Sequence, residues 1–542
     1  MLKRTVMSLA AVAAIAAALP AAAQEWDILI RNATVVDGTG AEPFAADVAV
    51  KNGKIALVGK ADAKAAAKDV IDARGLTLSP GFIDVHNHVT HSLLEPVDYT
   101  NSAYVTQGVT LIVSGPDGWM SPSEIRAELE RFEKTGFGTN YAYYVGHNGI
   151  RREVMGHAQR APNAEELERM KALVREGMEM GAVGFSTGLM YEPGMFSDTA
   201  EVIALAREVA PYDGTYDSHT RNPVHDIIGS ESEAIEVGKA AGIPAKLGHL
   251  KAVGLKNKGR IGEVIKLVEE ARAAGFDVVS DQYPYDGAAT GLLEDVIVLG
   301  KRDPDFHEPQ TREAVLAAVK DPADRAKIKD WTENGIDGGF SWVKAVGYGS
   351  MRVVHAPGNP ELVGENIELL ARKRNQDPFD LVVDLIAKSD KPVMVTLGAI
   401  DEADVRALMV QPWNMVSSDG GYVHGDKDSF HHPRSTGTFT RILGHYVRDE
   451  GVLTLAEAVR KMTSLPAEHL RLHDRGRIAE GYAADIAIFD AARVRDRSTW
   501  TDPTALSEGV VHVLVNGVPV LRDEKMTGAK PGKFIKRQKK PN

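Results

Sequence analysis

The chain has 542 residues, 44% of them hydrophobic and 25% charged, a balance typical of a soluble globular protein with more than one domain. Its formal net charge of −12 disfavours nucleic acid as a partner. Because the sequence contains no cysteine, disulfides, thiolate nucleophiles and thiolate metal ligands are excluded.

Residues 1–23 have the composition of an export signal. Lys3 and Arg4 precede an apolar run at 7–18, and a proline and an Ala-x-Ala motif follow. A membrane anchor is the alternative, but the apolar run is short and Ala-dominated. We therefore expect cleavage after Ala23, a periplasmic or secreted protein without a membrane span, and a mature net charge of −14 because two positive charges are lost.

Short strands are predicted near both ends of the chain, at 24–80 and 475–525. Apolar and polar residues alternate in both stretches, and Asn52 and Gly53 separate two such runs as in a β-hairpin. We expect the two ends to form one small β-sandwich. The segment 526–542 is a basic tail, which we expect to be a solvated and mobile end.

The middle of the chain, 81–474, alternates short apolar runs with amphipathic helices. The runs lie at 81–88, 109–115, 140–147, 182–188, 215–220, 244–251, 276–285 and 413–420. Eight strands in alternation with helices predict an α/β fold with a (β/α)₈ TIM-like barrel. A doubly wound open sheet is the alternative.

Two of the helices have clear boundaries. Asn163 and Glu166 form a capping-box pattern before an apolar stripe, and Gly181 marks its end. A second helix is predicted over 263–275. The stretch 286–412 is too long for a single connection, so we expect an inserted subdomain there.

Polar residues follow the predicted strands, where barrel active sites are assembled. In "GFIDVHNH", His86 and His88 are two residues apart, so they point to the same side of a strand. The other strand ends carry Asp117, His147, His219, His249, Tyr283 and Asp419. So many imidazoles and carboxylates predict a metal site, and this donor set suits zinc while tolerating manganese, iron or cobalt. Asp419 is the predicted proton-transfer residue.

Strand alternation extends the prediction to lysines. In "PAKLGHLK", His249 and Lys251 are two residues apart, which places Lys251 in the pocket and Lys246 outside the barrel. Arg434 is either a carboxylate-binding residue of the pocket, which we favour, or a surface arginine.

The remaining candidates are weaker. His147 is expected to be structural, and no role is predicted for His424, His431 or His432, which lie on a lid-like loop. Ser186 and Ser417 lack the Gly-x-Ser-x-Gly context of a nucleophile.

From about Asp27 to Leu521, the chain resembles the N-acyl-D-amino-acid deacylases (D-aminoacylases) of the amidohydrolase superfamily. The resemblance rests on "GFIDVHNH", "VGFSTGLMYEPG", "YDSHTRN", "GHLK", "DQYPY", "SSDG" and "HHPRSTGTFTRILG", in that order. It implies a barrel binding one or two zinc ions that hydrolyses the amide of an N-acyl-D-amino acid or a similar small amide with metal-activated water.

The resemblance also implies roles for single residues. The tight zinc belongs to His219 and His249, and a second, weaker metal position to His86 and His88. Asp419 is the general base and acid. Three further residues hold the substrate carboxylate or polarise its carbonyl: Lys251, Tyr283 and Arg434.

Asp117 marks a departure from the family. The family has a cysteine ligand at this position, whereas this chain has "GPDG". The fourth strand carries no lysine that could be carboxylated to bridge two metals, so Asp117 is the expected bridging ligand. Its alternative is a turn residue, since Pro-Asp-Gly is also a good β-turn.

Two other functions remain open on the sequence alone. One is a dipeptidase or other small-amide hydrolase on the same scaffold. The other is a non-catalytic periplasmic solute-binding protein, which would have no need of Asp419 beside paired histidines. The sequence carries no indication of an oligomeric state.

Overall fold

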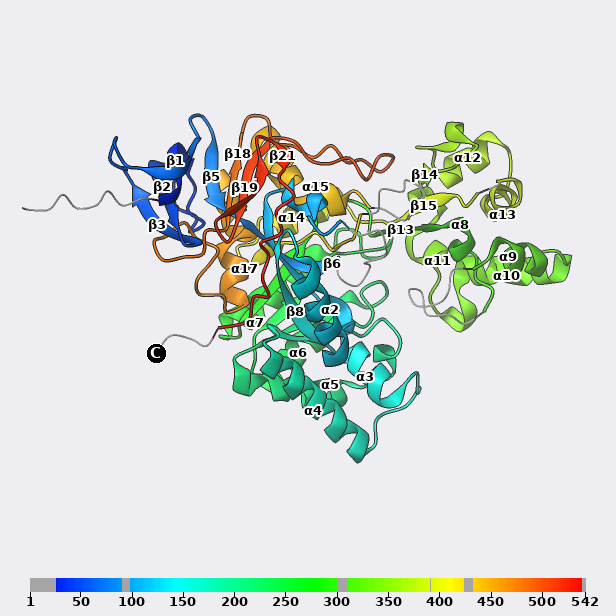
Figure 1. Cartoon of the computed structure of the whole chain (residues 1–542). Helices are drawn as coiled ribbons and strands as arrows, with labels where there is room; N and C mark the ends of the chain where they lie inside the picture. The colour runs from blue at the N-terminus through cyan, green and yellow to red at the C-terminus, as the bar shows by residue number, and fades with distance from the viewer. Residues whose placement is uncertain (1–25, 90–97, 301–309, 390, 424–431, 539–542) are drawn as a thin grey trace, which may run out of the picture.

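The computed structural model describes residues 26–89, 98–300, 310–389, 391–423 and 432–538 (Figure 1). The predicted export signal, His424 and His431 lie outside these ranges. Among the described residues, no helix combines the length and the apolar composition needed to cross a membrane.

Both ends of the chain contribute strands to one mixed sheet, as predicted (Figure 1). Its nine strands are β1 (Trp26–Val35), β2 (Phe44–Lys51), β3 (Lys54–Gly59), β4 (Ala67–Asp72), β5 (Thr77–Pro80), β18 (Ile486–Phe489), β19 (Val510–Val515), β20 (Val518–Arg522) and β21 (Lys525–Met526). The predicted hairpin joins β2 to β3, and Asn52 and Gly53 both have positive φ, 52° and 73°. Hydrogen bonds link all nine strands in one continuous sheet.

The central strands form a closed parallel barrel, as the alternation predicts. They are β6 (Phe82–His88), β7 (Val109–Ser114), β8 (Asn140–Gly146), β9 (Gly184–Gly188), β10 (Thr215–His219), β11 (Ala245–Leu247), β12 (Val278–Gln282), β16 (Asn414–Val416) and β17 (Gly420–Gly421). The last two are halves of one interrupted eighth strand. Since β16 pairs with β12 and β17 pairs with β6, the hydrogen bonding closes, and an open doubly wound sheet is excluded.

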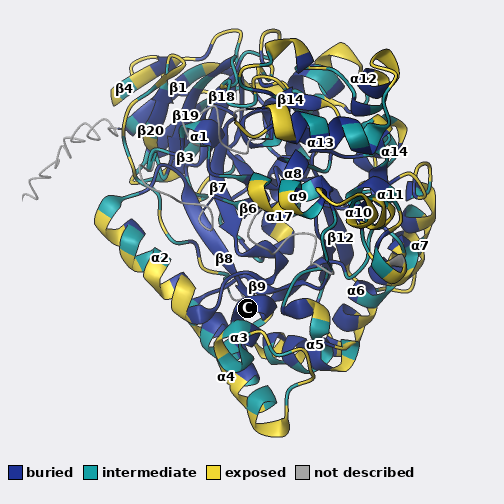
Figure 2. Ribbon diagram, turned by 90° about the vertical axis from the view of Figure 1, so that its right-hand side faces the viewer, coloured by how far each residue is buried: buried dark blue, intermediate teal, exposed yellow. Residues whose placement is uncertain are grey.

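Helices surround the barrel, and their outward faces are exposed while the strands are buried (Figure 2). They are α1 (Ser102–Val105), α2 (Pro122–Thr135), α3 (His147–Met155), α4 (Ala164–Met180), α5 (Thr199–Ala206), α6 (Ile227–Ala241), α7 (Ile261–Ala273), α14 (Glu402–Met409), α15 (Arg434–Arg441), α16 (Leu455–Met462) and α17 (Ser464–His469). The predicted capping box of Asn163 and Glu166 begins α4, and Gly181 ends it in a left-handed conformation.

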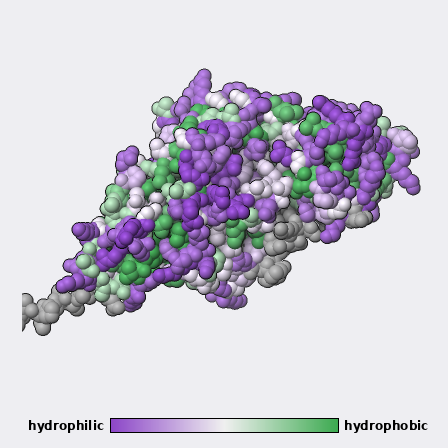
Figure 3. All heavy atoms as spheres, turned by 90° about the horizontal axis from the view of Figure 1, so that it is seen from above, coloured by the Kyte–Doolittle hydropathy of each residue, from purple (hydrophilic) through white to green (hydrophobic). Residues whose placement is uncertain are grey.

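An inserted subdomain leaves the barrel after β12 and returns before α14 (Figure 1). Its antiparallel sheet consists of β13 (Ala289–Leu292), β14 (Val353–His355) and β15 (Met394–Leu397). Its helices are α8 (Leu293–Val296), α9 (Arg312–Ala318), α10 (Pro322–Asn334), α11 (Trp342–Val346), α12 (Ile367–Lys373) and α13 (Pro378–Lys388). Seen from above, the molecule is elongated, and hydrophobic side chains form separate groups on a mainly hydrophilic surface (Figure 3).

The C-terminal tail is packed against the barrel, so the expectation of a solvated end is wrong up to residue 538. Tyr141 of β8 donates its backbone N–H to the carbonyl of Lys533 at 3.0 Å, and Ile535 donates back to Tyr141 at 2.8 Å. The rings of Phe534 and Tyr141 stack with centroids 6.1 Å apart, and Ile535 is buried. The prediction rested on the basic composition of the tail and overlooked Phe534 and Ile535, the two apolar residues that pack against the barrel.

We expect Ile535→Ala to lower the free energy of unfolding by about 2 kcal/mol or more, because it removes a buried aliphatic side chain. The measurement is the shift in urea midpoint. Lys533→Ala, which truncates an exposed side chain in the same segment, is the matched control and should be nearly neutral. Equal midpoints for the two variants would contradict a docked tail.

Candidate metal centre

The carboxylate of Asp117 lies at the centre of four imidazoles. Its Oδ1 is 3.3 Å from His86 Nε2. Its Oδ2 is 3.5 Å from His88 Nε2, 3.6 Å from His249 Nε2 and 3.7 Å from His219 Nδ1. These residues come from β6, from the turn after β7, from β10 and from the turn after β11. The barrel therefore brings together all five residues predicted as metal ligands.

Three residues of this site have left-handed backbone conformations. Asp117 has φ 57°, His249 has φ 35° and Asp419 has φ 50°. Such conformations cost free energy for residues other than glycine, and they occur preferentially at functional sites. Each of the three follows a barrel strand, where the chain bends and turns the side chain toward the barrel axis.

Several buried nitrogen and oxygen atoms that could ligate a metal have no hydrogen-bond partner in this cluster. They include both ring nitrogens of His86, Oδ1 of Asp117 and Nε2 of His219. One ligand atom each from His86, Asp117, His249 and Asp419 lie within 4.8 Å of one another. Because unpaired buried polar atoms are costly, a divalent cation is the group that would satisfy them together, and nitrogen with carboxylate oxygen suits zinc.

The charges of the site also fit a cation. Burial lowers the pKa of His86, but the neighbouring Asp117 more than offsets this and raises it to about 9. The pKa of Asp117 stays well below 3.8, because the charge of His86 and hydrogen bonds from His219 and His249 outweigh the effect of burial. Without metal, a proton on His86 therefore balances the buried carboxylate, and a bound cation would replace it. Burial and the charge of Lys251 lower the pKa of His249 to about 3, which leaves it neutral as a ligand must be.

Asp419 lies in the interruption between β16 and β17, beside the imidazoles. Its Oδ1 is 3.1 Å from His88 Nε2 and 3.6 Å from His86 Nε2. Its Oδ2 accepts a hydrogen bond from Arg434 at 2.6 Å. Burial raises its pKa, but the charge of Arg434 and a hydrogen bond from His88 more than compensate and hold it well below 3.8. Asp419 is therefore ionised, with one oxygen directed at the cluster and the other fixed by the guanidinium.

The three predicted substrate-binding residues lie together next to Asp419. The guanidinium of Arg434, at the start of α15, is 4.8 Å from the ring centroid of Tyr283, and Lys251 Nζ is 5.4 Å from the same centroid. The Arg434 side chain is 17% exposed and also donates to the carbonyl of Ala288, a pocket position rather than a surface one. Two cations flanking one phenol form a suitable receptor for a small anion.

Lys246 lies inside the barrel, so its predicted position outside is wrong. It is fully buried, with Nζ 2.5 Å from Asp281 Oδ2 and 3.0 Å from Asp217 Oδ1. The physical reason is that β11 ends at Leu247 and His249 turns with positive φ, so two-residue alternation does not extend from Lys246 to His249. Asp281 also accepts the His249 backbone N–H at 2.9 Å.

Two residues near the ligands were missed by the sequence reasoning. Tyr191 places its hydroxyl 2.7 Å from His219 Nδ1. Asp281 joins Lys246 to the backbone of His249, and its Oδ1 is 3.8 Å from His86 Nδ1. Tyr191 lies in "LMYEPG", just after a strand, and Asp281 lies in "SDQYPY", at the end of one. Their positions at strand ends could have identified both as site residues.

The weaker candidates have structural partners. His147 Nε2 is 2.9 Å from Glu201, and Ser186 donates to the carbonyl of Gly115. Ser417 donates to Asp281. His432, the first described residue after the gap at 424–431, lies 3.1 Å from the carbonyl oxygen of Gly287 and accepts the backbone N–H of Arg434.

Known proteins resemble this chain over its whole length. D-aminoacylase of Alcaligenes xylosoxydans xylosoxydans is 32% identical over 536 residues, which is 95% of this chain and 98% of that protein. The chain belongs to the N-acyl-D-amino-acid deacylase family. N-acyl-D-glutamate deacylase of the same organism is 31% identical over 95% of this chain and 97% of its own, and an amidohydrolase-family profile matches residues 329–521.

Solved structures of the deacylase family have the same fold. A crystal structure of D-aminoacylase superposes with a TM-score of 0.74 at 30% identity and covers 94% of this chain and 100% of its own. The N-acyl-D-glutamate deacylase of Bordetella bronchiseptica, complexed with zinc and a phosphonate mimic of the tetrahedral intermediate, gives 0.73 at 28% identity, with 95% and 100% covered. A further D-aminoacylase structure concerns a binuclear metal centre. The predicted family and barrel are thus confirmed, and the predicted zinc cofactor has a counterpart in a structure of that family.

Substitutions at Asp117 test whether it is a ligand or a turn residue. As a ligand, Asp117→Asn should lose most bound metal and most activity, because a neutral amide is a poor ligand for zinc. Asp117→Cys should recover metal binding, since a thiolate binds zinc well. Metal content per chain and turnover are measured together.

The turn alternative gives the opposite result for the same variants. Asparagine serves a turn as well as aspartate does, so Asp117→Asn would then be almost silent. Unchanged metal content and turnover in Asp117→Asn would exclude Asp117 as a bridging ligand.

Proposed function

We propose that the protein is an exported, metal-dependent deacylase that hydrolyses the amide bond of N-acyl-D-amino acids. The observation that carries this proposal is the donor cluster around Asp117, in a chain similar over its whole length to deacylases of D-amino acids. The signal-like composition of residues 1–23 supports export.

The proposed ligands are His86, His88, Asp117, His219 and His249. A divalent metal held there supplies Lewis-acid polarisation of the amide carbonyl and lowers the pKa of a water nucleophile. The orphaned nitrogens of His86 and His219 support this assignment.

The protein's own groups orient the substrate. Arg434 and Lys251 bind its carboxylate, since both cations lie against the ring of Tyr283 beside the cluster. Burial raises the pKa of Tyr283, so its hydroxyl stays protonated and can donate to the amide oxygen. Fixing the carboxylate places the amide carbon at the cluster.

Asp419 moves the protons. Its Oδ1, on the side of His88 and His86, takes a proton from the attacking water. Its Oδ2 stays fixed by Arg434, so the carboxylate cannot rotate away. Asp419 then gives the proton to the departing amine nitrogen as the C–N bond breaks. The products are a carboxylic acid and a free D-amino acid.

A hydrolysis screen with metal analysis tests the activity itself. N-acetyl-D-amino acids should be hydrolysed much faster than their L-enantiomers and than dipeptides. Extended chelation should abolish turnover, and added zinc should restore it. Preference for dipeptides would favour a dipeptidase, and full activity in metal-free protein would contradict the proposed chemistry.

Asp419→Asn preserves the shape of the side chain but removes its proton-accepting capacity. We expect kcat to fall by about 10²–10⁴-fold with metal content retained. Asp330→Asn, which changes an exposed carboxylate on α10 of the inserted subdomain, is the matched control. A folded, metal-loaded Asp419→Asn variant with normal kcat would remove Asp419 from the mechanism.

Arg434→Ala removes both the hydrogen bond to Asp419 and the cation that binds the substrate carboxylate. Loss of the first should lower kcat equally for acids and esters, so comparing the two substrates isolates the second. We expect Arg434→Ala to raise KM for free-acid substrates far more than for the matching methyl esters, because the ester lacks the negative charge. Kinetics on both substrates give the comparison. Equal effects on acid and ester would show that Arg434 does not read the carboxylate.

A further inference from the structure

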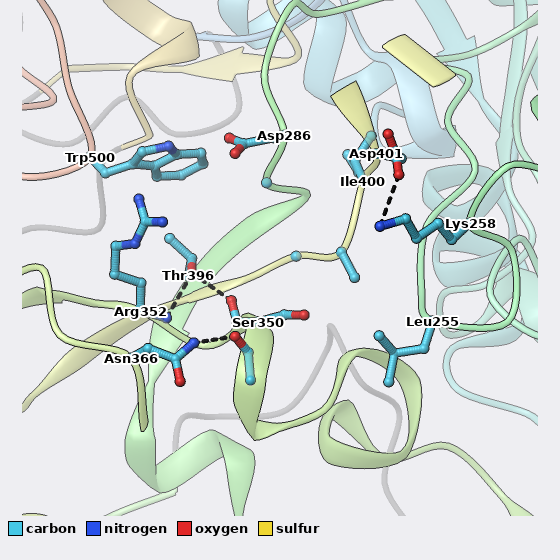
Figure 4. A pocket seen from close by; sticks show the side chains of 14 residues that line it. Leu255, Lys258, Asp286, Ser350, Arg352, Asn366, Thr396, Ile400, Asp401 and Trp500 are labelled. Atoms are coloured by element: carbon cyan, nitrogen blue, oxygen red, sulfur yellow. Dashed lines mark hydrogen bonds and ion pairs between the residues drawn. The ribbon is translucent and has the colours of Figure 1, made fainter. Parts of the chain in front are cut away.

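A cavity of about 260 Å³ lies where the inserted subdomain joins the barrel (Figure 4). We call it the neck cavity; its lining comes from the two connecting stretches, the subdomain, a barrel loop and the C-terminal region. The residues used below are Lys258, Asp286, Gly287, Arg352, Asp401 and Trp500. Its volume is at the small end of ligand pockets.

Four charged side chains line the neck cavity, and two of them are paired with each other. Lys258 Nζ is 3.0 Å from Asp401 Oδ2 at one wall. Arg352 and Asp286 are exposed, and neither side chain has a hydrogen-bond or ion-pair partner among the described residues. The backbone of Arg352 is fixed, because it exchanges hydrogen bonds with Thr396. Within the described ranges, the cavity thus presents one unpaired cation, Arg352, whose backbone is held in place, and one unpaired anion, Asp286.

The indole of Trp500 lies beside both of these charges, the Arg352 guanidinium and the Asp286 carboxylate (Figure 4). The indole packs on the backbone of Gly287, where a Cβ would come within 2.4 Å of the ring. Its ring centroid is also 4.4 Å from that of His432. This packing holds the indole in place as a flat apolar surface.

The neck cavity is separated from the metal centre by one chain segment. The carbonyl of Gly287 is paired with His432, and that of Ala288 accepts Arg434, on the side facing Asp419. Asp286, just before them, lines the neck cavity instead. The two sites are therefore back to back, and a ligand in one does not occupy the other.

We infer that the neck cavity binds a free α-amino acid in its zwitterionic form. Arg352 pairs with the carboxylate as a planar fork, Asp286 accepts hydrogen bonds from the ammonium group, and Trp500 contacts the side chain. An N-acylated amino acid lacks the ammonium group, so Asp286 would repel rather than bind it. That the ligand is a product of the enzyme rests on the proposed function, whereas the binding itself does not.

Isothermal titration of the full-length, zinc-loaded protein tests the inference, with Asp419→Asn as the parent so that nothing is turned over. The probes are D-leucine, N-acetyl-D-leucine and D-leucinamide, which carry both charges, the carboxylate alone and the ammonium alone. D-leucine should bind the neck cavity more tightly than D-leucinamide does, whereas N-acetyl-D-leucine, a substrate under the proposed function, should bind at the metal centre. Arg352→Gln and Asp286→Asn should each weaken D-leucine binding about tenfold or more. Arg374→Gln, an exposed arginine of the same subdomain outside the cavity, should change nothing.

Comparing the three probes shows which charged group of the ligand each side chain binds. Asp286→Asn should weaken D-leucine and D-leucinamide but not N-acetyl-D-leucine, and Arg352→Gln should spare D-leucinamide. Unchanged D-leucine binding in both variants, or no D-leucine binding by the parent at tens of millimolar, would overturn the inference. Because the titration needs no turnover, a protein without deacylase activity could still pass it, and an active deacylase could still fail it.

Discussion

The buried negative charge of Asp117 must be balanced, and the catalytic end of the barrel is organised around that requirement. Asp117 is 3% exposed, and an uncompensated carboxylate at such a site is strongly destabilising. Four imidazoles from the ends of three strands surround it. A proton on His86 meets the need in part, and a divalent cation meets it fully, so the folded protein is prepared for metal before any binds.

A second layer of charge supports the first. Beneath the cluster, Lys246 is buried between Asp217 and Asp281 and forms ion pairs with both carboxylates. Asp281 also holds the backbone of His249 and accepts a hydrogen bond from Ser417. The position of His249 therefore depends on a network that touches no substrate. Removing one partner would leave a buried charge without compensation.

Much of the site could be predicted from the sequence, because strand ends of a barrel converge on one point. His86 and Asp419 are far apart in the chain, yet both follow apolar runs in the βα pattern. The position of Lys246 inside the barrel could not be predicted. Its strand, β11, has only three residues, and the pattern of apolar and polar residues does not reveal that it ends at Leu247. The tail packs through Ile535 against β8, and the tail sequence alone does not indicate which strand it contacts. The neck cavity could not be predicted either, because residues as far apart in the chain as Lys258 and Trp500 line it.

The interrupted eighth strand has a consequence for the order of assembly. The backbone N–H of Asp419 donates to the carbonyl of His86 at 2.9 Å, across the seam where the last strand meets the first. All five proposed ligands precede residue 250, whereas Asp419 and Arg434 follow it by more than 150 residues. A chain growing from its N-terminus thus carries all five proposed ligands long before it carries Asp419, the proposed proton-transfer residue. Under the proposed function, the ligands and Asp419 therefore meet only when β17 pairs with β6 and closes the seam.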